Sequence, residues 1–220
     1  MISGLSIVSV LCLGAAVLTA LRWWRTRVDA LGRTRDLPVL SLSLLVVVAV
    51  VAAVPGARRG SEERRLERAA DKLVGHHVDV HCQTGAHALL DAGLELGYVL
   101  FDEDGVPEPE TVIKKQPCRD LAAYLRSDKS SPTPDQVVAV HVLTHESMHM
   151  RGEVDEAVTE CEAVQRDAVT ALVLGADHTE ALALARAYWR DVYPRMPDDY
   201  ATTDCAPGRS LDEGLATAPW

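Results

Sequence analysis

The chain has 220 residues and a formal net charge of −10, which suits one ordinary domain with an appendage. The charge is uneven: residues 1–60 hold seven Arg and two Asp, a net +5, which leaves −15 on residues 61–220. A domain this acidic repels phosphate backbones, so we expect no nucleic-acid partner. A single Phe leaves the core to Leu, Val and Ala.

Two uncharged apolar runs, 2–21 and 37–54, lie near the N-terminus. Each is long enough, or nearly so, to cross a bilayer as a helix. The alternative interpretation of the first run is a cleaved signal peptide. It has no basic segment before it, however, and RWWRTR follows where small residues would mark a cleavage site. We therefore predict two transmembrane helices, with residues 1–60 anchoring the chain in a lipid bilayer.

The loop between these runs predicts the orientation of the chain. RWWRTRVDALGRTRD (22–36) carries five Arg, and short basic loops stay in the cytoplasm. The segment 57–72 is also rich in Arg, although acids are interleaved with them. We predict a multi-pass protein of the plasma membrane whose C-terminal domain is extracytoplasmic.

The cysteines also indicate that the acidic domain is extracytoplasmic. Cys12 lies inside the first apolar run, and no CxxC spacing occurs in the acidic domain. Four Cys outside the cytoplasm indicate two disulfides, whereas four buried thiols would suit a cytoplasmic domain. The sequence leaves all three pairings open. The four candidates are Cys82, Cys118, Cys161 and Cys205.

The acidic part opens with a charged helical linker over 61–76. A short strand at 77–82 and a short helix at 85–97 follow. The pattern strand, turn and strand then predicts a β-hairpin over 98–116. Residues 118–127 read as a further helix.

A helix with a clear start and stop follows. Thr133, Pro134 and Asp135 supply an N-cap, a proline at the first helical position and an early acid. The helix is predicted to reach Arg151, where Gly152 provides a left-handed stop.

Two more helices complete the domain, over 155–174 and 179–192. From Pro194 the chain is rich in Pro, Asp and Gly, which predicts an irregular tail that Cys205 pins to the domain. The predicted class for 77–220 is mainly α with a small β-hairpin.

The first long helix carries the sequence His145-Glu146-Ser147-Met148-His149, an HExxH motif. Residues four apart share one helix face, so both imidazoles can bind one Zn²⁺ while the Glu reaches an attacking water. His141, one turn earlier, lies on the same face and can line the cleft or approach the metal.

This motif resembles the HExxH zinc peptidases, the zincins, over about residues 141–163. The resemblance implies a zincin-like α+β domain, a Zn²⁺ cofactor, ligands at His145 and His149, and a general base at Glu146. The family's oxyanion stabiliser is not assigned here, and the tyrosines and His178 are candidates by residue type.

The third ligand separates the subgroups. HESMHMRGEVD matches a metzincin-like pattern in which Gly152 turns the chain and Asp155 binds zinc, but no Met-turn follows and Asp155 also suits the N-cap of the next helix. Glu156 and Glu160 on that helix resemble the gluzincins, in which one acid completes the site and an acid four residues on orients the first His.

Helix geometry ranks these acids. If the two helices fold back about a turn at 152–153, Glu156 faces His149 and Glu160 faces His145. We therefore expect Glu156 to bind zinc and Glu160 to orient His145 or to replace Glu156, with Asp155 the third choice.

The predicted function is a membrane-anchored zinc metallopeptidase that hydrolyses a peptide or protein substrate with a zinc-activated water and Glu146 as base. The alternative is an extracytoplasmic binding module that is inactive or whose zinc is structural. A structural site closes all four positions with protein ligands, so His141 or Glu160 in the water position would favour the module.

Overall fold

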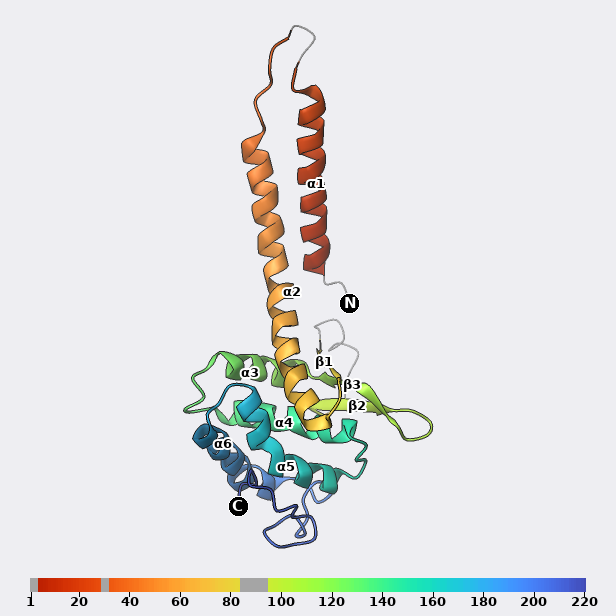
Figure 1. The fold of residues 1–220 in the computed structure, drawn as a ribbon, viewed down its shortest axis with the longest axis vertical. Coiled ribbons are helices and arrows are strands. Elements are labelled where there is room, and N and C mark those ends of the chain that lie inside the picture. Colours follow the sequence, from red (N-terminus) through yellow and green to blue (C-terminus); the bar gives the residue numbers. More distant parts are fainter. Residues whose placement is uncertain (1–3, 29–31, 84–94) are drawn as a thin grey trace. The chain divides into compact units, whose positions relative to one another are not determined.

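The computed structural model describes residues 4–28, 32–83 and 95–220. It divides into two units, Met1–Ser61 and Glu62–Trp220. The first is helical, and the second combines helices with one small sheet (Figure 1). The helix predicted for 85–97 falls largely on 84–94, outside the described residues.

The first unit contains two long apolar helices, as predicted. Helix α1 spans Gly4–Thr26 and helix α2 begins at Val39. Both are long and apolar enough to cross a bilayer. Within the unit the Ser9 hydroxyl donates to the Ala49 carbonyl at 2.9 Å, which satisfies a hydroxyl that lipid cannot.

Helix α2 is longer than the sequence indicated, because it runs from Val39 to Val74 through Pro55. The sequence predicts a membrane helix over 37–54 and a charged helical linker over 61–76. Proline removes one helical hydrogen bond, but the Ala-, Arg- and Glu-rich segment behind it favours helix strongly enough to continue. Membrane run and charged segment therefore form one helix.

The sheet of the second unit has three strands: β1 (Asp79–Cys82), β2 (Gly97–Phe101) and β3 (Pro107–Ile113). The predicted hairpin is confirmed, with β2 antiparallel to β3. The strand expected at 77–82 pairs in parallel with the far side of β3, giving the order β1-β3-β2. β2 is thus an edge strand.

Four α-helices follow, with bounds close to those predicted: α3 (Lys115–Arg126), α4 (Pro134–Met150), α5 (Glu156–Val173) and α6 (His178–Asp191). A short 3₁₀ helix, η2, covers Tyr193–Arg195. α5 packs against both α4 and α6, and α4 also contacts α3 and the sheet.

Helix α4 is the centre of this unit. Thr133 caps it in a capping box with Gln136, and Gly152 ends it with a φ of +104°, both as the sequence indicated. Every residue from His141 to Met150 is buried. Its polar side chains are therefore shielded from bulk water.

The four cysteines of this unit lie in two pairs at disulfide distance, which fits the two disulfides expected. Cys82 pairs with Cys118 and Cys161 with Cys205, at Cα–Cα distances of 5.8 and 5.5 Å. The second joins α5 to the irregular C-terminal tail. Gln165 of α5 holds the same tail, because its amide donates to the Leu211 carbonyl at 2.9 Å.

Candidate metal site

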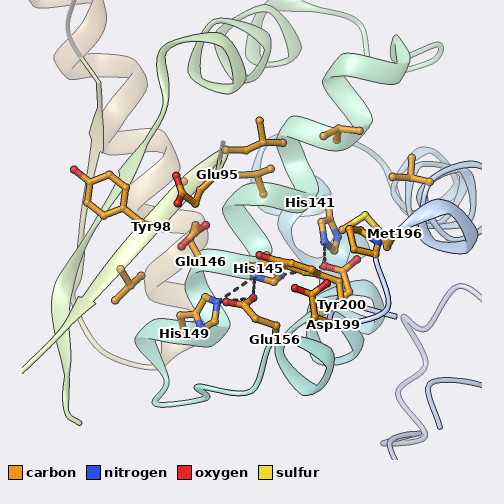
Figure 2. Close-up of a pocket in the computed structure, with 18 of the residues that line it drawn as sticks. Glu95, Tyr98, His141, His145, Glu146, His149, Glu156, Met196, Asp199 and Tyr200 are labelled. Carbon is orange, nitrogen blue, oxygen red and sulfur yellow. Dashed lines mark hydrogen bonds and ion pairs between the residues drawn. The ribbon is translucent and has the colours of Figure 1, made fainter. Parts of the chain in front are cut away.

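Two histidines of the HExxH motif and one acid from α5 bring three donor atoms together. Nε2 of His145 lies 3.1 Å from Nε2 of His149 and 3.1 Å from Oε2 of Glu156. The third edge, from Nε2 of His149 to Oε2 of Glu156, is 3.4 Å. Figure 2 shows the three side chains converging from the two helices.

This triangle has the size of one face of a tetrahedral zinc site. Zinc bonds to nitrogen and oxygen of about 2.0–2.2 Å place neighbouring ligand atoms roughly 3.3–3.6 Å apart in a tetrahedron. All three edges lie within a few tenths of an ångström of that range. Two imidazoles and one carboxylate are also a donor set that zinc uses in catalytic sites.

The other nitrogen of each histidine fixes which atom faces the metal position. Nδ1 of His149 donates to the Glu153 carbonyl at 2.7 Å, and Nδ1 of His145 donates to Oε2 of Glu160 at 3.1 Å. Both Nε2 atoms are left to bind a metal. A carboxylate behind a ligating histidine is a common arrangement at zinc sites.

Without a metal these groups share protons. Burial by itself lowers the pKa of His145, but hydrogen bonds to Glu156 and Glu160 raise it to about 9. Hydrogen bonds from His145 and His149 hold the pKa of Glu156 near 2. A divalent cation and a proton therefore compete for Nε2 of His145.

Glu160 is held by three donors in the core. Its Oε2 accepts from Nε2 of His141 at 2.9 Å as well as from His145, and its Oε1 accepts from the Tyr188 hydroxyl at 2.7 Å. Burial alone raises its pKa, but His141 and His145 bring it well below the usual range. Glu160 is thus a buried, ionised carboxylate whose position is determined from three sides.

His141 connects Glu160 to a further acid. Its Nδ1 lies 3.0 Å from Oδ2 of Asp167, and its ring stacks on Tyr188 with 3.6 Å between centroids. A ring that donates from both nitrogens carries both protons. Burial lowers the pKa of His141, but Asp167 and Glu160 outweigh it and raise the pKa to about 10.

Glu146 is buried beside the three donor atoms, and one of its carboxylate oxygens is unpaired among the described residues. That oxygen is Oε2. Burial raises the pKa of Glu146 to about 7, although His145 and His149 oppose the shift. A carboxylate with that pKa is suited to take and return a proton near neutral pH.

Gly97 of β2 provides the room for Glu146. A Cβ atom at this position would lie 2.8 Å from Oε1 and 2.9 Å from Cγ of Glu146. The edge strand and the buried carboxylate therefore pack together closely, and only a glycine fits without displacing the carboxylate.

A cavity of about 750 Å³ opens onto these groups. Figure 2 shows Glu95 and Tyr98 on one side of the histidines, and Met196, Asp199 and Tyr200 on the other. The tail thus supplies one wall. The Tyr200 ring lies 5.9 Å from that of His145, which makes it a better candidate oxyanion donor than His178, which does not line the cavity.

The structure places the predicted residues as follows. His145, His149 and Glu156 form one group of potential metal donors, and His141, His145 and Glu160 form a second. Asp155 joins neither group. Its carboxylate caps α5 by accepting from the Val158 amide at 3.0 Å.

Sequence reasoning missed Asp167, Tyr188 and the Gly97 contact. Asp167 falls in register with the acids of α5, since it is seven residues after Glu160, and that spacing was the one available signal. In searches of family models, curated proteins and solved structures, nothing matches this chain. Its function must be inferred from the site itself.

Proposed function

We propose that the chain is a membrane-anchored zinc metallopeptidase of the zincin type. His145, His149 and Glu156 hold the metal, and Glu146 is the general base. The observation that carries the proposal is the triangle of three donor atoms with edges of 3.1, 3.1 and 3.4 Å. Beside it lies the buried Glu146, whose Oε2 has no hydrogen-bond partner among the described residues.

When bound, zinc supplies Lewis acidity toward the scissile carbonyl and makes a water molecule easier to deprotonate. Glu146 takes that proton on Oε2 and passes it to the leaving amine, as its pKa near 7 allows. Tyr200, whose ring lies 5.9 Å from that of His145, is the candidate to donate to the developing oxyanion. Glu160 keeps Nδ1 of His145 protonated and its Nε2 directed at the metal.

The gluzincin subgroup describes the site best. One acid of the second helix reaches both ligand histidines, and the acid four residues on supports the first of them. The metzincin-like alternative needs Asp155 as ligand, whereas Asp155 caps α5.

The surroundings of the fourth coordination position favour a catalytic zinc over a structural one. His141 and Glu160, the two residues able to close the site, are hydrogen-bonded to each other at 2.9 Å. The three donors face the 750 Å³ cavity instead. A site that keeps one position for water or substrate is typical of catalytic zinc.

The test uses the full-length chain purified in detergent without chelator. We expect about one zinc per chain by elemental analysis and hydrolysis of a generic quenched peptide, lost with 1,10-phenanthroline and restored by zinc. Stoichiometric zinc without hydrolysis would support the binding module. A chain with neither would overturn the zinc site itself.

We further propose that residues 61–220 lie outside the cytoplasm, on the strength of the basic 22–36 loop and the paired cysteines. A phosphatase reporter, active only after export, fused after residue 75 should be active. A fusion after residue 30 should be inactive. The reverse pattern would place the domain in the cytoplasm.

Substituting Gly97→Ala tests the position of the base. The added methyl displaces the Glu146 carboxylate, so we expect kcat to fall by about 100-fold, as misplacement of a reacting group by an ångström does. Zinc content should stay at one per chain. Leu100→Ala, on the exposed part of the same strand, serves as control and should retain activity. Equal kcat for Gly97→Ala and wild type would show that the contact does not position the base.

A further inference from the structure

The charges of the cavity lining are mostly acidic, and the protonated His141 in it is held between Asp167 and Glu160. The lining residues, all within the described part of the chain, include carboxylates and no Lys or Arg. The segments outside that part, 1–3, 29–31 and 84–94, contain no Lys or Arg in sequence either. The lining carboxylates are Glu95, Glu146, Glu156, Glu160 and Asp199. No Lys or Arg side chain of this lining is therefore available to bind a substrate carboxylate.

Most of these carboxylates are already engaged. Glu95 forms an ion pair with Lys114 at 3.0 Å. Glu160 is satisfied by His141, His145 and Tyr188, and Glu156 belongs to the metal triangle. Their charges are offset by these partners or by the metal.

Glu146 is also unavailable to a substrate side chain, because in the proposed reaction it exchanges a proton with water. It is buried at the floor of the cavity beside Gly97. A substrate side chain that ion-paired with it would suppress the base.

Asp199 is the exception. It is exposed, lines the cavity next to Tyr200, and has no hydrogen bond or ion pair with any residue that the structure describes. Figure 2 shows it on the same side of the histidines as Met196 and Tyr200. Its neighbour Asp198 is equally exposed but does not line the cavity.

Resting on the proposed function, we infer that Asp199 selects polypeptide segments with a basic side chain close to the scissile bond. The site rejects segments with a carboxylate there. Opposite charges attract and like charges repel, and Asp199 has no cationic partner among the described residues that would cancel its charge. A free C-terminal carboxylate finds no Arg or Lys partner, so the enzyme cuts within chains or from their N-termini and is not a carboxypeptidase.

The remaining walls suit the rest of such a segment. They are apolar, with Leu96, Val99 and Phe101 from the β2 side and Val192 and Met196 from the α6 and tail side. Apolar side chains gain by leaving water for such walls. The chemistry of the substrate is therefore an apolar stretch with a neighbouring Lys or Arg.

The test compares internally quenched decapeptides that differ only in Lys, Gln or Glu at one position, moved through the four residues on each side of the scissile bond. With the wild-type full-length chain, kcat/KM should favour Lys over Glu by on the order of 10-fold at one position, as expected for a partly exposed charge. Asp199→Asn should bring that ratio toward one, and Asp199→Lys should invert it. Asp198→Asn is the matched control and should keep the wild-type ratio. Zinc content is measured for each variant.

The outcomes separate this inference from the function beneath it. Hydrolysis with no charge preference, or with a preference that Asp198→Asn and Asp199→Asn reduce equally, overturns the role of Asp199 and leaves the peptidase standing. Preferred release of C-terminal residues overturns the exclusion of carboxypeptidase activity. A chain that binds zinc and cleaves none of the peptides overturns the proposed function, and this inference with it.

Discussion

Replacing Glu146 with Gln is expected to abolish peptide hydrolysis and to leave both zinc and the fold in place. The two side chains have the same shape, so the close packing against Gly97 is preserved. Only the proton acceptor is lost. A positioned general base contributes about 10²–10⁴-fold, and kcat should fall by that factor at unchanged zinc content.

The measurement is steady-state hydrolysis of a quenched peptide, with elemental analysis and thermal unfolding of the same sample. Glu110→Gln, on an exposed position of β3, is the matched control and should behave as wild type. Residual activity above a tenth of wild type in Glu146→Gln would assign the base elsewhere. Loss of zinc in that variant would mean that Glu146 binds the metal.

Removal of either HExxH histidine is expected to cost the metal altogether. His145→Ala and His149→Ala each delete an Nε2 donor of the triangle, and two ligands rarely retain zinc against a chelator. The acids of α5 should rank differently from each other. Glu156→Gln removes a charged donor that contacts both Nε2 atoms and should weaken zinc binding most.

Glu160→Gln should weaken zinc binding by about 10–100-fold, because Glu160 acts through Nδ1 of His145. Competition with a chromophoric chelator measures these affinities in the full-length chain, and thermal unfolding identifies variants that fail to fold. Asp155→Asn is a matched control, since Asn caps α5 equally well and should leave the affinity unchanged. If Glu160→Gln strips the metal while Glu156→Gln keeps it, the ligand roles are reversed. If Asp155→Asn strips it, the metzincin-like assignment holds.

Much of the fold could be predicted from sequence because its determinants are local. The capping box at Thr133, the proline behind it and the left-handed Gly152 set the limits of α4 within a few residues. The hairpin follows from two strand-like runs on either side of a turn that contains Gly105. The four-residue spacing of His145 and His149 puts them on one helix face whatever packs around them.

The proximity of Glu156 to these histidines could also be predicted from the sequence, because a short turn forces two successive helices to run back along each other. Its distance to both Nε2 atoms required the packed structure. The parallel pairing of β1 with β3 was not predicted, since it joins residues some thirty positions apart and depends on loop closure rather than local preference.

The sequence by itself determined the two apolar helices, the helix that carries the HExxH motif and the acids that follow it, since each depends on residues within one or two helical turns. Only the tertiary structure decided which acid faces which nitrogen, that Asp167 and Tyr188 support Glu160, and that Gly97 lies against Glu146. It also brought Asp199 and Tyr200 to the cavity from the far end of the chain. These contacts join segments that share no periodicity, so they arise from packing of the core and from the Cys161–Cys205 link, which no local pattern encodes.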